Sequence, residues 1–207
     1  MSKEKSIQRV DPEFIASLEQ YTIPQILSKQ AEQLGASHVA LREKAYGIWE
    51  TYTWKDYFRY AKAVGLGLKS LGLQRGDNVC LILDNHVEWL FSELGAQSVG
   101  GVTVPLFTSA VAKELVYGLN RVKARYVFAQ DQEQVDKLLA EREQLPDVEM
   151  VIYIDPTGMR NYRDNPWLIS FAQLLELGEE LDEEQPELFI KELWEGKPQD
   201  IALMLMT

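Results

Sequence analysis

The sequence predicts an α/β protein built on a mainly parallel sheet with helices on both faces. Residues 79–83 are apolar at every position and follow a turn at residues 74–77, a pattern typical of a strand covered on both faces. From Val79 onward, strand-like and helix-like segments alternate, and the connections are as long as a helix. Such connections predict parallel strands in one sheet, with residues 79–83 in its interior.

The helices are predicted from capping residues that precede apolar positions at three- and four-residue steps. The expected starts are Thr22 with Gln25, Thr53 with Asp56, Asp84 or Asn85, Thr108 or Ser109, Asp131 with Gln134, and Ser170. Pro24 fits the first turn of the first helix. Gly35 and Gly72 predict the ends of the first two helices.

The strands are predicted from short apolar runs between turn residues. Two runs around Gly47 predict a hairpin, and the remaining runs belong to the parallel sheet; the segments are 39–44, 48–52, 79–83, 102–104, 126–129, 148–154 and 201–206. Residues before about Tyr21 lack a sustained period and predict an arm. The pattern between residues 157 and 198 is weak, and an acidic run at residues 176–187 predicts a solvated face or loop.

Composition excludes several classes of protein. The 207 residues carry a net charge of −11, which gives no basic face for nucleic acid. No apolar run approaches the length of a membrane span, so we expect at most peripheral membrane contact. The N-terminal residues do not form a secretory signal, and the single cysteine, Cys80, falls inside an apolar strand as a buried side chain. We therefore expect a cytoplasmic location.

The candidate pocket lies at the carboxyl ends of the strands, where open α/β sheets bind ligands. The corner at residues 84–86 and the end of the following strand meet there, so Asn85, His86 and Pro105 are the candidate pocket residues. The sequence contains no nucleophile elbow and no pair of cysteines or histidines at metal spacing, so it predicts no catalytic residue and no metal site. The glycines at residues 65, 67 and 72 fall within or at the end of a helix, which excludes a dinucleotide loop.

Several stretches together resemble the N-terminal part of AMP-forming acyl-CoA synthetases, over nearly the whole chain. They are Tyr52-Thr53-Trp54, residues 71–79, Asn85 with Glu88-Trp89, and residues 100–106. The segment 200–207 is similar to the strand that leads into the family's phosphate loop, so Thr207 would be the first residue of that loop. Residues 47–49 and the long segment 157–198 are most similar to the long-chain fatty acid branch. Phe107-Thr108 departs from the family, where many relatives have a proline, so the loop after Pro105 is expected to differ.

The resemblance implies a reaction and a set of ligands. In this family a carboxylate attacks the α-phosphate of ATP, and the acyl-adenylate then passes its acyl group to CoA, with Mg²⁺ on the phosphates. Fatty acid, ATP and CoA would be the partners of the intact enzyme. Of the residues present, only Thr207 matches a nucleotide-binding position. The chain by itself, ending at its own active site, is expected to be inactive and to bind none of these cofactors tightly.

The resemblance also implies a division at residue 53. Residues 1–53 would form an arm, a helix and a hairpin that belong to a second, incomplete subdomain, and residues 54–207 the α/β subdomain. The first part is expected to pack poorly on the second, and its unpaired strand edges would favour self-association.

Two other classes of function fit the pattern of elements. One is a self-standing flavodoxin-like or receiver-like binding module, which needs a ligand loop or clustered acidic residues at the strand ends. The other is a structural, partner-binding domain. The residues that follow Thr207 would separate the three.

Overall fold

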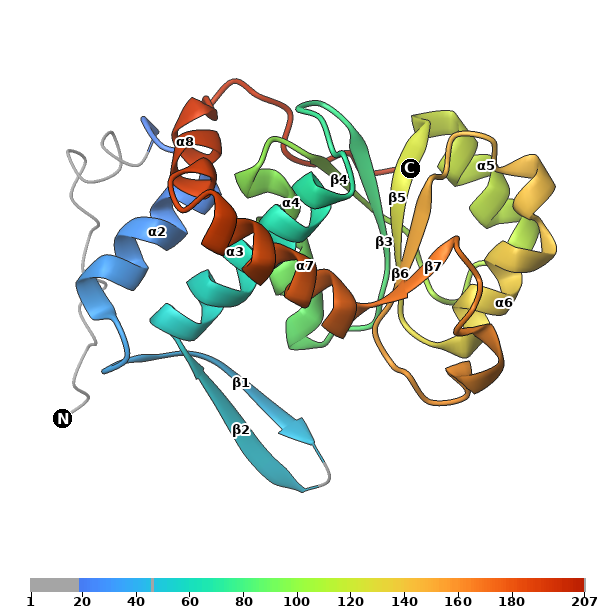
Figure 1. Ribbon diagram of the computed structural model, residues 1–207, viewed down its shortest axis with the longest axis horizontal. Helices are drawn as coiled ribbons and strands as arrows, with labels where there is room; N and C mark the ends of the chain where they lie inside the picture. The colour runs from blue at the N-terminus through green and yellow to red at the C-terminus, as the bar shows by residue number, and fades with distance from the viewer. Residues whose placement is uncertain (1–18, 46, 207) are drawn as a thin grey trace, which may run out of the picture.

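The computed structural model describes residues 19–45 and 47–206. Its centre is a five-stranded sheet in the order β4-β3-β5-β6-β7, in which every pair of neighbours is parallel. The strands are β3 (Asn78–Ile82), β4 (Val102–Pro105), β5 (Ala124–Ala129), β6 (Met150–Tyr153) and β7 (Leu168–Ser170). The predicted fold class is confirmed, with β3 in the interior of the sheet and β4 directly beside it (Figure 1).

Helices cover both faces of this sheet (Figure 1). One layer contains α3 (Trp54–Ser70), α4 (Val87–Ser98), α7 (Phe171–Glu184) and α8 (Leu188–Glu195). The other contains α5 (Ala112–Val122) and α6 (Gln132–Ala140). Two short 3-10 turns, Arg142–Gln144 and Met159–Tyr162, precede and follow β6.

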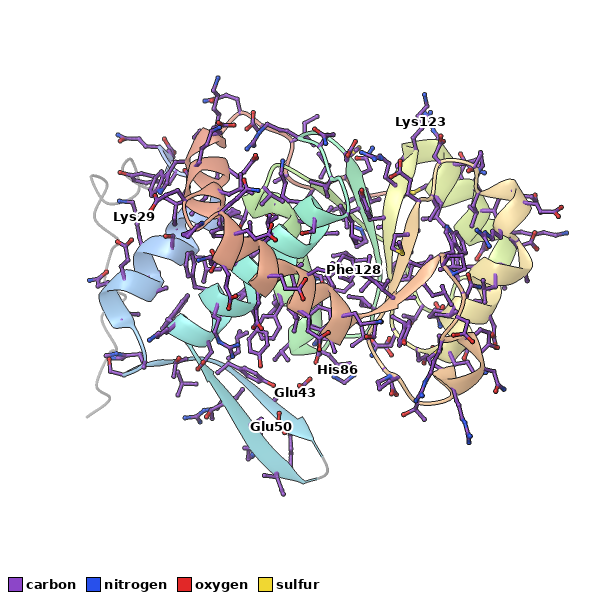
Figure 2. The ribbon with its side chains drawn as sticks, viewed as in Figure 1. Lys29, Glu43, Glu50, His86, Lys123 and Phe128 are labelled. Carbon is purple, nitrogen blue, oxygen red and sulfur yellow. The ribbon has the colours of Figure 1, made fainter. Side chains whose placement is uncertain are left out.

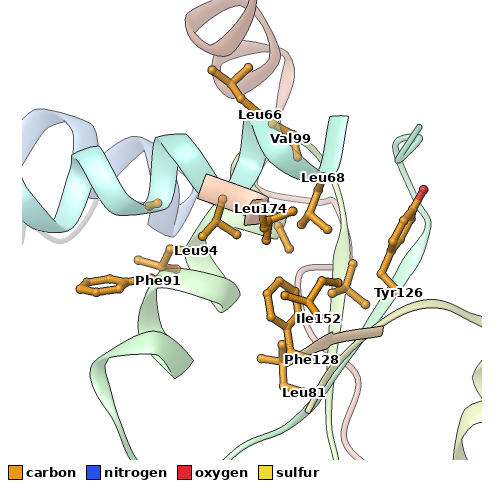
Figure 3. Close-up of a cluster of buried hydrophobic side chains, with 14 of the residues drawn as sticks. Leu66, Leu68, Leu81, Phe91, Leu94, Val99, Tyr126, Phe128, Ile152 and Leu174 are labelled. Atoms are coloured by element: carbon orange, nitrogen blue, oxygen red, sulfur yellow. The ribbon is translucent and has the colours of Figure 1, made fainter. Parts of the chain in front are cut away.

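The alternation of side chains along β3 divides the core in two. Val79 and Leu81 point into the cluster beneath α3, α4 and α7, where Figure 3 shows Leu81 near Phe128. Cys80 and Ile82 point into the cluster beneath α5 and α6. Each face of the strand therefore buries apolar area, which explains why residues 79–83 are apolar at every position.

Glycines allow α3 to approach its neighbours closely. A Cβ at Gly178 of α7 would lie 1.9 Å from the Ala63 carbonyl oxygen of α3, and one at Gly67 of α3 would lie 2.2 Å from the Leu174 carbonyl oxygen of α7. A Cβ at Gly95 of α4 would lie 2.7 Å from Val64. The glycines of α3 thus have a packing role, consistent with the exclusion of a dinucleotide loop.

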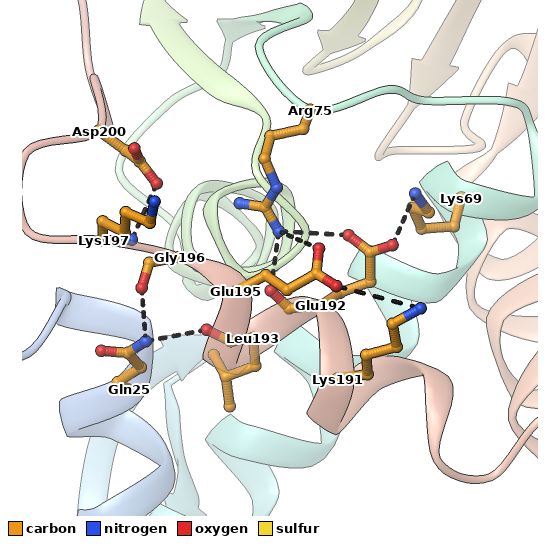
Figure 4. Close-up of polar contacts among 10 residues, drawn as sticks. All are labelled: Gln25, Lys69, Arg75, Lys191, Glu192, Leu193, Glu195, Gly196, Lys197 and Asp200. Carbon is orange, nitrogen blue, oxygen red and sulfur yellow. Dashed lines mark hydrogen bonds and ion pairs between the residues drawn. The ribbon is translucent and has the colours of Figure 1, made fainter.

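The first described helix, α2 (Ile23–Leu34), packs on the rest of the molecule. Thr22 and Gln25 form the predicted capping box, and Gly35 follows the helix with a positive φ of 53°. The side-chain amide nitrogen of Gln25 also donates to the backbone carbonyls of Leu193 and Gly196, at 3.0 and 2.9 Å (Figure 4). The expectation that everything before Trp54 packs poorly is wrong for this helix, because Gln25 and Leu27 are buried.

Ion pairs hold α8 to the layer that contains α3. Glu192 of α8 lies 3.1 Å from the Lys69 ammonium and 3.3 Å from the Arg75 guanidinium (Figure 4).

The predicted arm before Tyr21 falls largely on residues 1–18, which lie outside the described part of the chain.

The hairpin forms a separate sheet. Strands β1 (Val39–Ala45) and β2 (Ile48–Thr53) pair antiparallel with each other, as predicted. Its outer residues Ile48 and Trp49 are exposed, whereas Tyr52 packs against Phe91 of α4. The hairpin therefore contacts the helical layer near its base through Tyr52, and farther along β1 through Glu43, whose carboxylate lies 2.7 Å from Nδ1 of His86.

Three segments near the C-terminus differ from what the sequence predicted. The acidic run does form a solvated face, but most of it is helical rather than a loop, because α7 extends to Glu184; its Asp182 pairs with Lys62 of α3 at 2.7 Å. β7 was not predicted as a strand because its three residues are too few to show a period. Residues 201–206 do not form a full strand: they make one parallel bridge, from Leu203 to Thr103 of β4.

Candidate functional site at the carboxyl ends of β3 and β4

A cavity of about 470 Å³ opens where β3 and β4 end. Asn85 and Pro105, two of the predicted pocket residues, line it. The complete lining is Leu83, Asp84, Asn85, Trp89, Pro105, Leu106, Phe107, Thr108, Leu205 and Met206. The cavity thus occupies the edge of the sheet where ligands of open α/β folds bind.

Hydrogen bonds fix the corner after β3. The Asp84 backbone amide donates to the side-chain oxygen of Gln130 at 2.9 Å, which joins the corner to the end of β5. The Asp84 carboxylate accepts a hydrogen bond from the Thr108 hydroxyl, also at 2.9 Å. The Asp84 side chain is therefore held at the pocket by the loop that follows β4.

Neither Asp84 nor Asn85 caps α4, so that prediction is wrong. The N-cap residue is His86, with extended backbone angles, and its side chain makes no capping bond. The Asp84 carboxylate lies too far back in the chain and is engaged by Thr108. The first turn of α4 consequently presents backbone N–H groups without a side-chain cap.

The hydrogen bond between Thr108 and Asp84 also shapes the loop after β4. Thr108 does not start a helix; α5 begins at Ala112, where the Glu114 carboxylate accepts from the Val111 backbone amide at 3.1 Å. The ammonium of Lys137 on α6 donates to the Thr108 carbonyl at 2.9 Å. Phe107, which lines the pocket, is 82% exposed.

The C-terminal segment runs along β4 toward the pocket. The Thr103 amide donates to the Ala202 carbonyl, and the Met204 amide donates to the Thr103 carbonyl, both at 3.0 Å. This parallel placement brings Leu205 and Met206 to the pocket wall. Thr207, the predicted nucleotide-binding residue, follows Met206 in the sequence and lies outside the described residues.

His86 does not join this pocket. Its side chain turns toward the hairpin, where Nδ1 lies 2.7 Å from the Glu43 carboxylate (Figure 2). His86 is thus separated from Asn85 and Pro105, although it directly follows Asn85 in the chain. The sequence offered no signal for this contact, because Glu43 is 43 residues away.

Trp89 was missed as a pocket residue, although a signal for it was present. It lies in the first turn of α4, directly after the corner at residues 84–86 that was predicted to line the pocket. Its side chain lines the cavity from the side of this helix. Trp89 therefore forms a firm apolar wall on the α4 side of the pocket.

The described lining does not fit a triphosphate on its own. Asp84 is its one charged side chain among the residues described, and a carboxylate repels phosphate. The same lining does not fit a receiver-like module, which needs several carboxylates at the strand ends. What the lining does supply is an apolar wall with one fixed carboxylate.

The fold and this pocket define an α/β chain of the class that binds ligands at strand ends, and comparison with known proteins narrows the class. Residues 27–207 match the model of the family described as AMP-binding enzyme. This chain therefore belongs to the AMP-binding enzyme family, as the sequence resemblance implied.

Two curated relatives illustrate the match. The long-chain-fatty-acid–CoA ligase ACSBG1 of Bos taurus is 30% identical over 200 residues, which are 96% of this chain and 26% of that protein. The ligase ACSBG2 of Xenopus laevis is 26% identical over the same share of each chain. The present chain thus spans about a quarter of the length of the curated relatives that it matches.

A solved structure shares the fold. The anthranilate CoA ligase AuaEII, in complex with anthranoyl-AMP, superposes with a TM-score of 0.61 at 23% identity, over 76% of this chain and 28% of that one.

None of the helices in the described part of the chain has the length and apolar character that a bilayer crossing requires.

Proposed function

We propose that this chain is the N-terminal part of an AMP-forming ligase that joins a long-chain fatty acid to CoA. The observation that carries the proposal is the parallel placement of residues 201–206 beside β4, which directs the chain at Met206 into the pocket. Thr207, the first residue of the expected phosphate loop, comes next in the sequence. Long-chain acids are favoured because the matching curated relatives are named long-chain-fatty-acid–CoA ligases.

In this proposal the described residues form one wall of the reaction site. Trp89, Phe107 and Met206 give that wall its apolar surface, and Asp84 fixes the loop after β4 through Thr108. Fatty acid, ATP, Mg²⁺ and CoA are ligands of the full-length enzyme. The groups that neutralise the phosphates come from sequence other than the residues described, since the lining offers no cationic side chain among them.

The 207-residue chain alone is proposed to be inactive and to bind ATP weakly. A phosphate loop binds through several backbone N–H groups at a helix N-terminus together with a cation. The printed sequence includes the first position of the expected loop and none of its later ones. Each missing donor of this kind is worth about 3 kcal/mol of transition-state stabilisation, so no turnover is expected.

The division at residue 53 and self-association are proposals of the same kind. The assignment of residues 1–53 to a second subdomain is supported by the separate sheet of β1 and β2, whereas α2 packs on the end of α8. The outer edges of that hairpin, with Ile48 and Trp49 exposed, support pairing between copies of the 207-residue chain. Sedimentation of this chain at increasing concentration tests the pairing. The cytoplasmic location stays a prediction.

The overall reaction tests the proposal. The full-length protein that contains this chain is incubated with ATP, Mg²⁺, CoA and fatty acids of increasing chain length, and acyl-CoA and AMP are measured together by mass spectrometry. We expect equal amounts of both products, with the highest yield for long-chain acids. Production of acyl-CoA from short acids alone would refute the long-chain assignment, and absence of acyl-CoA with every acid would refute the ligase.

A further inference from the structure

Three side chains with metal-binding atoms meet where the hairpin joins the helical layer. Glu43 comes from β1, His86 is the N-cap of α4, and Glu88 lies in the first turn of α4. One ligand atom from each lies within 4.8 Å of the other two. Figure 2 shows Glu43 and His86 near each other beside the hairpin, with Glu50 next to Glu43.

The position of Glu50 makes this group of carboxylates unusual. Glu43 and Glu50 lie directly opposite each other in the antiparallel hairpin, an arrangement that destabilises a strand pair when both are charged. Among the described residues, neither these two nor Glu88 forms an ion pair with a lysine or arginine. Glu50 instead accepts a hydrogen bond from the Tyr52 hydroxyl at 3.1 Å. Glu43 and Glu88 therefore share one imidazole, that of His86, and Glu50 lies opposite Glu43.

We propose that Glu43, His86 and Glu88 bind a divalent transition-metal ion of the zinc type, which joins the hairpin to the N-terminus of α4. An imidazole nitrogen together with carboxylate oxygens favours zinc and its neighbours over magnesium and calcium. Ligand atoms bonded to one zinc ion at about 2.0–2.2 Å lie about 3–4 Å apart. Side-chain rotation is enough to bring atoms within 4.8 Å to that spacing.

Access to the site is open. The His86 side chain is 50% exposed and that of Glu43 is 20% exposed, so an ion reaches them from solvent and retains water at a remaining position. None of the three residues lines the pocket at the ends of β3 and β4. The proposal is therefore independent of the ligase function.

Calorimetric titration of the 207-residue chain with zinc chloride tests the site, with magnesium chloride as the comparison. We expect one zinc ion per chain and at least tenfold weaker binding of magnesium. His86→Ala and Glu43→Gln should each weaken zinc binding at least tenfold. His38→Ala is the matched control, because His38 is the other histidine of the sequence, is exposed and contacts Ser37 rather than a carboxylate.

Amide hydrogen exchange gives a second readout that does not depend on activity. Zinc should slow exchange in β1 and β2 of the parent chain and of His38→Ala, but not of His86→Ala. Failure to bind one zinc ion per chain would overturn the proposal. Zinc binding that is unchanged in His86→Ala would also overturn it. So would a loss of zinc binding in His38→Ala as large as that in His86→Ala, or an equal affinity for magnesium.

Discussion

Tyr126 is completely buried in β5, so its hydroxyl needs a partner inside the protein. It donates a hydrogen bond to the Leu71 carbonyl at 2.8 Å, just after the end of α3. Tyr126→Phe removes this bond and leaves the carbonyl without it, which should lower the free energy of unfolding by about 1 kcal/mol. Urea titration near neutral pH measures the change, and an unchanged midpoint would show that the bond contributes nothing.

The pKa of Tyr126 predicts how the contribution of this residue to stability depends on pH. Burial raises the pKa of Tyr126 from its ordinary value of 10.0 to about 12, so the folded state retains the phenol proton where the unfolded state releases it. The stability advantage of the parent over Tyr126→Phe should be complete below pH 10 and should decrease as the pH rises toward 12. Paired urea titrations across this range measure the difference. A difference that stays constant would contradict the assigned shift.

Cys80 is predicted to be inert in the folded protein. It is fully buried in β3, and burial raises the pKa of its thiol to about 12. The thiolate is the reactive form, so a disulfide reagent at pH 8 should label the native chain only as fast as it unfolds. Labelling followed by absorbance should become immediate in denaturant. Rapid labelling of the native chain would place Cys80 at the surface.

At the scale of elements, the contact between α3 and α7 depends on Gly178. A Cβ there would lie 1.9 Å from the Ala63 carbonyl oxygen, so Gly178→Ala must push the helices apart. Overpacking of this kind costs about 1–3 kcal/mol. Thermal unfolding of Gly178→Ala beside Glu179→Ala, an exposed neighbour in the same helix, separates packing from helix propensity. Equal stability of the two variants would contradict the close approach.

The elements that the sequence predicted well are those fixed by nearby residues. The caps at Thr22, Thr53, Asp131 and Ser170 were all found, because each hydroxyl or carboxylate bonds an amide three residues later. The start of α5 was missed because the Thr108 hydroxyl binds Asp84, 24 residues earlier in the chain. Contacts between distant segments leave no local pattern, and they decided both this start and the direction of His86.

At the scale of the whole molecule, the pocket was predicted in place but not in composition. Parallel strands bring their carboxyl ends together, which was enough to locate Asn85 and Pro105 at one edge. The apolar wall formed by Phe107 and Met206 depends on how residues 201–206 lie against β4. The apolar run at residues 201–206 predicted a strand of the sheet, but its position beside β4 and at the pocket wall arises from tertiary packing.

The proposal that this chain belongs to an AMP-forming fatty acid ligase is tested most directly by exchange of labelled pyrophosphate into ATP. The full-length protein containing this chain should catalyse the exchange without CoA, only when a long-chain fatty acid is present. The 207-residue chain, measured beside it, should catalyse none. Exchange by the 207-residue chain would contradict the need for the rest of the phosphate loop, and a full-length protein inert toward every acid would contradict the ligase function itself.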